Sequence, residues 1–487
     1  RKHTFIRRES YRLDYISKVE LGETKTENPY DTFKEFYTKN YQQFIEYNIQ
    51  DVELVDKLED KMKLIELHLT MAYEAKVNYQ DCFGQVRIWD TIIFNHLKSK
   101  NIVIPAVVES KQSRGYEGAY VKDPVVGFHD WIVSFDLNSL YPHLIMQYNM
   151  SPDTYIPTKF PQDISVKKLL EGEVDITALT TSTVTPNGAM FSTKRQGFLP
   201  ELLEEMYDKR VLTKNKMIQH RRDLENTPKE DISTIKKLEY AITAENNNQM
   251  AKKIALNSCY GALGNQYFRY FNRDIAEGIT TAGQLSIKWV EKAVNKYMNK
   301  LLETDEDYVV AIDTDSIYVR FDELVSKVSP KNPVDFLDTI AREKIEPMIN
   351  DSYEELASYM NAYQNKMHMG REVIADKGIW TAKKRYILNV YDSEGVRYKT
   401  PKLKLMGIET AKSSTPMWCR KKLEQGIKVV MNETEHDVWE FITDAWNEFK
   451  KLPAEEISFP RGVQNVTKYS NPASIYKKGT PIHVRGS

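Results

Sequence analysis

The chain has little cysteine, almost no net charge and no long apolar run. Its 487 residues include only Cys82, Cys259 and Cys419, which lie too far apart to predict a disulfide framework or a zinc site. No stretch approaches the roughly 20 apolar residues of a membrane span, and no signal-peptide pattern is present. We therefore expect no membrane partner and a reducing, cytoplasmic location.

The net charge of −1 hides an uneven distribution. Residues 371–425 hold 13 Lys and Arg against 6 Asp and Glu, whereas residues 303–355 are strongly acidic. An acidic centre beside a basic strip fits a protein that follows a phosphate backbone. A solvated basic face would have the same composition. The length predicts several domains with ample core.

Residues 307–321 predict a β-hairpin with an acidic tip. Apolar and β-branched residues flank Asp313-Thr314-Asp315-Ser316, which is too short and polar for anything but a tight turn. Two neighbouring carboxylates repel each other unless a cation neutralises them, and oxygen ligands favour Mg²⁺ over zinc or copper. Standing alone, the motif is also typical of a solvated acidic turn.

A second carboxylate is predicted at the end of another buried strand. The strand pattern Trp131–Phe135 delivers Asp136 where a turn begins, and Ser139–Tyr141 lie in that turn before Pro142. Carboxylates from separate strands that hold two Mg²⁺ ions form the clamp used for in-line phosphoryl transfer. Successive backbone amides of a turn can also bind phosphate oxygens. By itself, an Asp in this position is commonly only a cap.

A third group of residues lies on a predicted helix. Lys253, Asn257 and Tyr260 follow one another at i, i+4 and i+7 and so share one helix face. A cation, an amide and an aromatic ring suit a triphosphate and a base. Each residue taken singly fits a surface helix with a tyrosine packed into the core equally well.

Together these segments resemble motifs A, B and C of the family B DNA polymerases. The matching stretches are Asp136-Leu-Asn-Ser-Leu-Tyr-Pro142, Lys253 to Gly261, and Asp313-Thr-Asp-Ser316, in the same order and spacing. Within the family, the chain is most similar to the replicative polymerases of T-even-type bacteriophages. The likeness extends through Asn257–Asn265 and Met406–Pro416 and covers nearly the whole chain.

The resemblance implies template-directed DNA synthesis, with primer-template DNA and dNTPs as partners, in the host cytoplasm if the protein is phage-encoded. Two Mg²⁺ ions, for which Mn²⁺ could substitute, would be held by Asp136, Leu137, Asp313 and Asp315. The implied catalytic residues are Asp136, Asp313, Asp315 and Lys253. The implied nucleotide-binding residues are Leu137, Ser139, Leu140, Tyr141, Arg210, Lys214, Lys253, Asn257 and Tyr260. The implied DNA-binding residues are Tyr116, Gly118, Lys383, Lys384, Arg385, Tyr386 and Lys412.

The resemblance also implies an α+β fold shaped as a polymerase right hand, with an antiparallel-sheet palm, two-helix fingers, a partial helical thumb and an incomplete ribonuclease-H-like exonuclease remnant. Arg210 and Lys214 on the first finger helix would face the same way as Lys253. The expected domains are the end of a 3′–5′ exonuclease (1–63), a connector (64–107), palm (108–196), fingers broken at 226–228 (197–265), palm (266–407) and the start of the thumb (408–487).

Tyr47 and Asp51, near a predicted helix start, resemble the last exonuclease motif. Its partner carboxylates would lie upstream, so we expect the chain to be a fragment without exonuclease activity. Remaining polymerase segments are expected partners, but these residues give no support for a sliding clamp. Two departures from the family lie beside the site: Ala311-Ile312 replaces Tyr-Gly, and His143 replaces a small hydroxyl residue.

Two alternatives remain open at this stage. The chain could be a catalytically silent fragment that binds DNA and nucleotides, or an RNA-directed polymerase or nuclease with the same two-metal carboxylates. A nuclease does not need the Lys253–Tyr260 helix face or Tyr141. Reverse transcriptases usually have adjacent aspartates where this chain has Asp313-Thr-Asp315.

Overall fold

The computed structural model describes residues 10–107, 115–137, 139–412 and 415–458. Asn138, Ser413, Ser414, the first residues of the predicted palm and residues 459–487 of the predicted thumb lie outside them. The described fold is α+β with antiparallel sheets, as predicted. None of the described helices is long and apolar enough to cross a membrane.

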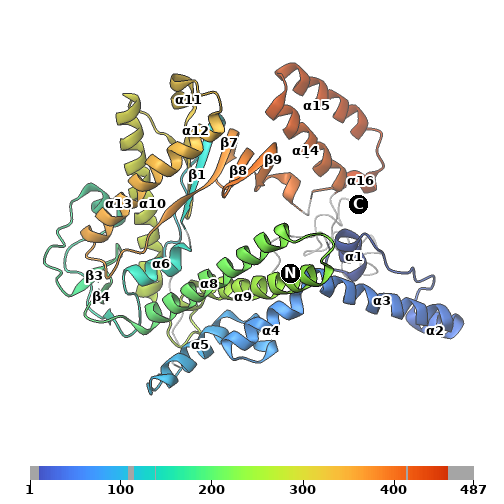
Figure 1. Cartoon of the computed structure of the whole chain (residues 1–487), viewed down its shortest axis with the longest axis horizontal. Coiled ribbons are helices and arrows are strands. Elements are labelled where there is room, and N and C mark those ends of the chain that lie inside the picture. The colour runs from blue at the N-terminus through green and yellow to red at the C-terminus, as the bar shows by residue number, and fades with distance from the viewer. Residues whose placement is uncertain (1–9, 108–114, 138, 413–414, 459–487) are drawn as a thin grey trace, which may run out of the picture.

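The N-terminal part is entirely helical (Figure 1). It comprises α1 (Leu13–Leu21), α2 (Phe33–Lys39), α3 (Tyr41–Met62), α4 (Leu64–Ala75), the 3₁₀ turn η1 (Tyr79–Phe83) and α5 (Gln85–Ser99). The predicted helix containing Tyr47 begins earlier than expected, at Tyr41, because Asn40 caps it by accepting a hydrogen bond from the Gln43 amide.

A six-stranded antiparallel sheet forms the centre of the molecule, in the order β5-β6-β1-β7-β8-β9. Its strands are β1 (Gly127–Leu137), β5 (Val309–Asp313), β6 (Ser316–Arg320), β7 (Met369–Ala382), β8 (Arg385–Ser393) and β9 (Val396–Met406). The predicted acidic hairpin is thus confirmed as β5–β6. A small second sheet has the order β2-β4-β3, with β2 (Tyr155–Ile156), β3 (Ser182–Val184) and β4 (Met190–Ser192).

Helices cover one face of the large sheet. Val133 and Phe135 of β1 are packed in one cluster with α10 (Arg273–Leu302) and α13 (Glu346–Tyr359). Ile132 belongs to a separate cluster with residues of β7 and β8. Because side chains alternate along a strand, Asp136 shares the face of Ile132, away from the helices. The remaining elements beside this layer are α6 (Leu140–Gln147), α7 (Val166–Glu171), α11 (Asp322–Val328), α12 (Pro333–Ile340) and the π-helical turn η2 (Ala341–Ile345).

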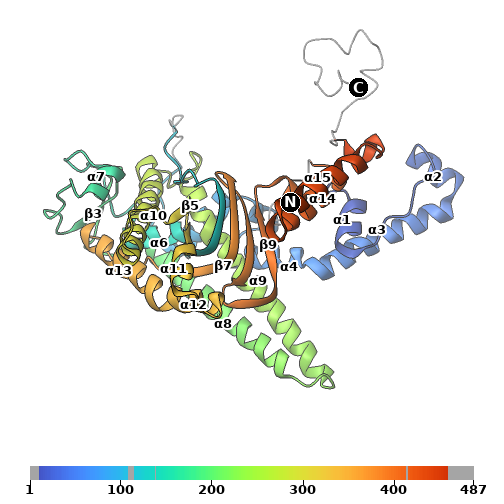
Figure 2. The ribbon, with the colours of Figure 1, turned by 90° about the horizontal axis from the view of Figure 1, so that it is seen from above.

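Two long helices, α8 (Phe198–Asn226) and α9 (Ile232–Leu263), confirm the helical pair predicted over 197–265. Their connected ends extend beyond the sheet (Figure 2). Asp231 begins α9 by accepting a hydrogen bond from the Thr234 amide at 3.1 Å. At the other end, Ala251 of α9 is buried with residues of α4 and α5.

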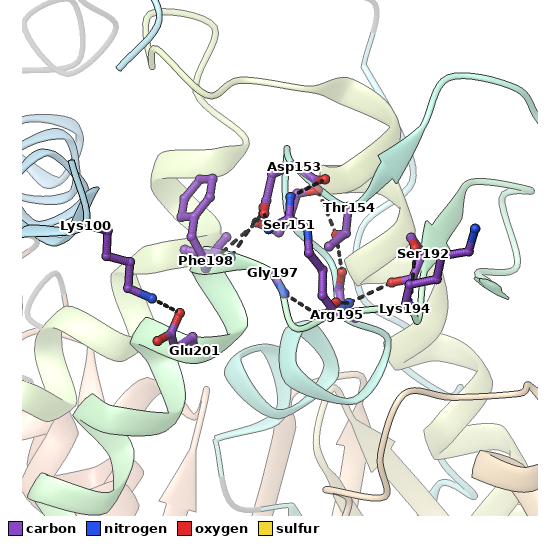
Figure 3. Close-up of polar contacts among 12 residues, drawn as sticks. Lys100, Ser151, Asp153, Thr154, Ser192, Lys194, Arg195, Gly197, Phe198 and Glu201 are labelled. Carbon is purple, nitrogen blue, oxygen red and sulfur yellow. Dashed lines mark hydrogen bonds and ion pairs between the residues drawn. The ribbon is translucent and has the colours of Figure 1, made fainter. Parts of the chain in front are cut away.

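The start of α8 is fastened to the turn at residues 149–154 (Figure 3). The Gly197 amide donates to Asn149 Oδ1 at 2.8 Å, and the Leu199 amide donates to Ser151 Oγ at 3.3 Å. A Cβ on residue 197 would lie 2.5 Å from the Ser151 Cβ. Only a glycine at this position therefore lets the two segments come so close. The helix therefore starts from a fixed point.

The C-terminal part is a separate helical group, which follows the short turn η3 (Glu409–Ala411). It contains α14 (Met417–Asn432), α15 (Glu435–Phe449) and α16 (Ala454–Ile457). Figure 1 shows α14 and α15 side by side next to β9. The basic strip predicted over 371–425 therefore spans β7, β8, β9 and the first half of α14.

Candidate active site

Antiparallel pairing brings the acidic hairpin onto the end of β1. Asp136 lies opposite Ser316 in the β1–β6 register, and the Ser316 hydroxyl donates a 2.6 Å hydrogen bond to Asp136 Oδ1. The Leu137 amide donates to the Asp315 carbonyl at 3.0 Å. The two acidic segments predicted to act together, 180 residues apart, are thus direct neighbours.

The Asp136 and Asp315 carboxylates are partly buried and repel each other. Burial, followed by the negative charge of Glu372, raises the pKa of Asp136 to about 6 against the opposing hydrogen bond from Ser316. Burial and then the charge of Asp136 raise the pKa of Asp315 to about 7. Such shifts are typical of sites in which a positive group is needed to keep both carboxylates ionised.

Asp313 is held differently from the other two aspartates. It ends β5, and its Oδ1 forms a 3.0 Å ion pair with Lys384 Nζ. Lys384 lies in the turn between β7 and β8, where it adopts a left-handed backbone with φ +58°. The predicted DNA-binding turn therefore already contacts a predicted metal ligand.

The three aspartates offer oxygen ligands of the kind that divalent ions take. Their donors are hard carboxylate oxygens, which Mg²⁺ and Mn²⁺ prefer, and the mutual repulsion of Asp136 and Asp315 is what a dication would relieve. Among the described residues, however, three or more acidic, His or Cys side chains do not converge into one metal-holding group. The donor chemistry fits, with Asp313 turned toward Lys384.

The turn after β1 meets helix α9 through tyrosines. Ser139 precedes α6, and the ring of Tyr141 lies 4.6 Å from the ring of Tyr260, centroid to centroid. The hydroxyl groups of Tyr260 and Tyr116 are 3.3 Å apart. Burial raises the pKa of Tyr141 and of Tyr260, so both stay neutral phenols. Three predicted ligand-binding tyrosines from distant segments thus form one cluster.

The predicted helix-borne cations lie on α8 and α9. Lys253 is half-buried and Asn257 exposed on α9, and within the described chain Lys253 makes no ion pair. Arg210 is half-buried on α8, where burial lowers its pKa, and Lys214 is exposed one turn further on. Leu140 is buried at the start of α6. The structure leaves Lys253 and Lys214 available to a ligand.

All four predicted DNA-binding cations are paired with carboxylates. Besides Lys384, Lys383 lies 3.1 Å from Asp123, and Arg385 and Lys412 both contact Glu409, at 2.7 and 2.9 Å. Tyr386 is only 4% exposed, and its hydroxyl lies 2.7 Å from that of Tyr318. Gly118 is exposed, and its carbonyl accepts a hydrogen bond from Gln284 at 2.6 Å.

The residues assigned to an exonuclease remnant lie apart from this site, on α3. Tyr47 is buried against the rings of Phe33 and Phe36. Asp51 forms a 2.6 Å ion pair with Lys25. Both side chains therefore have structural partners within the N-terminal part of the chain.

Sequence reasoning missed two residues beside Asp136. Ser316 was part of the recognised hairpin motif, and its role follows only from the strand register. Glu372 on β7 accepts a 3.2 Å hydrogen bond from Ser134 and pairs with Lys404 at 2.9 Å. The signal for Glu372 was a charged residue within an apolar strand pattern, which often marks a site.

Comparison with known sequences agrees with this geometry. The chain belongs to DNA polymerase family B, and its match to that family covers residues 83–479. It is 36% identical to the DNA-directed DNA polymerase of Escherichia phage RB69 and 34% identical to that of Enterobacteria phage T4, in both cases over 100% of this chain and 59% of the relative. The DNA polymerase delta catalytic subunit of Caenorhabditis elegans is 28% identical over 64% of this chain and 27% of its own length. The chain thus spans about three fifths of the length of its phage relatives.

Proposed function

We propose that the chain carries out template-directed DNA synthesis for replication, adding dNTPs to a primer 3′-hydroxyl. The observation that carries the proposal is the meeting of three segments: Asp136 at the end of β1, Asp313 and Asp315 on the β5–β6 hairpin, and the Tyr141–Tyr260 contact with α9. Membership of DNA polymerase family B and the names of the phage relatives support the same reaction.

In this proposal the large sheet is the palm, α8 and α9 are the fingers, and α14–α16 begin the thumb. Primer-template DNA would lie along the β7–β8 turn, contacting Lys383, Lys384 and Arg385. Cations at such positions can probe the minor groove of any correct base pair without reading sequence. Tyr116, Gly118 and Lys412 would contact the DNA nearby, and the buried Tyr386 would support the β7–β8 turn from beneath through Tyr318.

The incoming dNTP would lie between the Ser139–Tyr141 turn and α9. Backbone amides of the turn would bind phosphate oxygens, and Lys253 with Arg210 would stabilise the charge that develops on the leaving pyrophosphate. Lys214 and Asn257 would contact the triphosphate further out. The Tyr141 ring would stand under the sugar and exclude a 2′-hydroxyl by a clash.

Asp136, Asp313, Asp315 and the Leu137 carbonyl would hold two divalent ions, which supply charge neutralisation and lower the pKa of the attacking hydroxyl when bound. Lys384 must release Asp313 for that ligand set to form. Contact of Lys384 with DNA phosphates would provide the exchange, because a phosphate can replace the carboxylate as its partner. Binding of DNA would in this way prepare the metal site.

Primer extension on a primed template tests the proposal, with Mg²⁺, four dNTPs and low salt. We expect extension by the chain and none by its Asp136→Ala variant, although that variant should still bind primer-template DNA. Extension by the variant would contradict the assignment of Asp136. DNA and dNTP binding without extension by the wild-type chain would instead favour the catalytically silent alternative, because the phage relatives are longer.

A further inference from the structure

His143 occupies an unusual position directly behind the turn that is proposed to bind the triphosphate. It lies one helical turn after Ser139, and the residue as a whole is 7% exposed. Ser139 has a left-handed backbone, φ +53° and ψ 55°, which is unfavourable for a residue with a Cβ. Something in the surroundings must therefore hold this turn in place.

The side chain of His143 provides one such restraint. The Ser139 carbonyl accepts two hydrogen bonds from His143, one from its backbone amide at 3.2 Å and one from ring Nδ1 at 3.0 Å. Because a carbonyl only accepts, Nδ1 must carry the proton. A small hydroxyl side chain, which the resemblance implies at this position, has no ring that could make this contact.

The other side of the ring contacts helix α8. The His143 and Tyr207 rings meet edge to face, with centroids 4.5 Å apart and an interplanar angle of 86°. Tyr207 lies three residues before Arg210, so the two occupy the same side of α8 about one turn apart. His143 thus joins the Ser139 turn to the segment of α8 that carries Arg210, which is proposed to bind the triphosphate.

The space beside this contact is not filled. His143 and Tyr207 line a cavity of about 240 Å³ between α6, α8 and the segment before β7, together with Glu204, Lys366 and His368. Close packing therefore does not surround the two rings on that side, where an ion pair between Lys366 and Glu204 connects α8 to the segment before β7. Burial and the nearby cations Lys366 and Arg210 lower the pKa of His143, which keeps the ring neutral.

We propose that His143 is a positioning residue that couples the Ser139–Tyr141 turn to helix α8 through the ring of Tyr207. The inference rests on the proposed function, because it assigns the turn and Arg210 to one dNTP site. When α8 moves toward a bound nucleotide, the ring pair would carry that movement to the turn. The position of each ring then depends on the position of the other.

Single-turnover incorporation of one dNTP, measured across dNTP concentrations, tests this coupling. We expect His143→Ala to raise the dNTP Kd or lower the maximal rate by roughly tenfold or more, as small displacements of a reacting group do. The Kd for primer-template DNA should stay unchanged, and the variant should stay folded at the assay temperature, although the lost hydrogen bond and ring contact lower its Tm. His143→Asn, which retains a donor for the Ser139 carbonyl, should recover part of the loss. Tyr207→Phe, which keeps the ring, should match the wild-type protein.

The decisive readout is non-additivity. Tyr207→Leu should impair dNTP use, and the His143→Ala/Tyr207→Leu double variant should be no worse than the more impaired single variant. Losses that multiply, single variants that match the wild type, or a loss explained entirely by unfolded protein at the assay temperature would each overturn the coupling. Incorporation by the wild-type chain in the same assay reports separately on the proposed function.

Discussion

Two neighbouring lysines on α9 show how one residue's surroundings decide its role. The side chain of Lys252 is 7% exposed and its Nζ lies 3.2 Å from the Glu74 carboxylate of α4, whereas Lys253 makes no ion pair within the described chain. A buried, paired lysine fastens α9 to α4, while its neighbour is left for a ligand. The ligand role of Lys253 stays a prediction from the sequence, whereas the ion pair of Lys252 with Glu74 is visible only in the structure.

We therefore expect opposite effects from the two alanine variants. Lys253→Ala should lower dNTP incorporation by at least tenfold while leaving the Tm and DNA binding unchanged, because in the proposed site its charge would act on the triphosphate alone. Lys252→Ala should lower the free energy of unfolding by about 1 to 2 kcal/mol with incorporation largely retained. Single-turnover kinetics and thermal melts of both proteins check this; a DNA-binding defect in Lys253→Ala would contradict the assignment.

The raised pKa of Asp315 predicts how metal-free stability depends on pH. Because its folded pKa of about 7 exceeds the ordinary 3.8, the folded state holds an extra proton between these values. Its contribution to stability is therefore lost as pH rises from about 4 to 7. In EDTA, Asp315→Asn should raise the Tm at pH 8, and the difference should shrink at pH 5.

Asp305→Asn is the matched control, since Asp305 is exposed and makes no ion pair in the described structure. It should leave the Tm unchanged at both pH values. Added Mg²⁺ should raise the Tm of the wild-type protein at pH 8 more than that of Asp315→Asn. A lower Tm for Asp315→Asn in EDTA at pH 8 would argue that the carboxylate is not a strained, unneutralised group.

At the scale of the element, α8 depends on its fixed start. Gly197→Ala should cost about 1–3 kcal/mol of stability, because the new methyl would overlap Ser151 and push α8 away from the turn at 149–154. Gly115→Ala is the control, since a Cβ there meets no atom within 4 Å. Chemical unfolding of both variants makes the comparison. Equal stabilities would mean that α8 is not seated by this contact.

Local sequence patterns predicted the elements well where their cause is local. The β5–β6 hairpin follows from apolar strands around Asp313-Thr-Asp-Ser316, and the break between α8 and α9 coincides with Pro228. The start of α3 was misplaced because its cap, Asn40, lies outside the motif containing Tyr47. Motif spacing says little about where a helix begins.

What could not be predicted depends on pairing across long separations. The sheet order places β1 between β6 and β7. Pairing with β6 allows the hydrogen bond between Ser316 and Asp136, and pairing with β7 brings the charge of Glu372 near Asp136. The strand order cannot be predicted from the hydrophobic periodicity of any single segment. The contacts of Lys384 with Asp313 and of His143 with Tyr207 likewise join segments whose sequences carry no mutual signal.

At the scale of the whole molecule, many cations of the basic strip are paired with carboxylates, some inside the strip and some outside it. Glu409 alone occupies both Arg385 and Lys412. Glu409→Gln should free both cations and tighten primer-template binding several-fold at low salt. The slope of log Kd plotted against the logarithm of the salt concentration should become steeper by about 1 to 2. Glu343→Gln, an exposed and unpaired acid among the described residues, controls for net charge. Equal effects of the two variants would place the DNA elsewhere.

Template-directed incorporation is the central activity proposed for this chain. The measurement is addition of one nucleotide to a primer opposite each of the four template bases, with Mg²⁺ and with EDTA, by the wild-type chain and by Asp136→Ala. We predict that only the complementary dNTP is added, only with Mg²⁺, and only by the wild-type chain. Addition that ignores the template base, or that survives the loss of Asp136, would contradict the site described here.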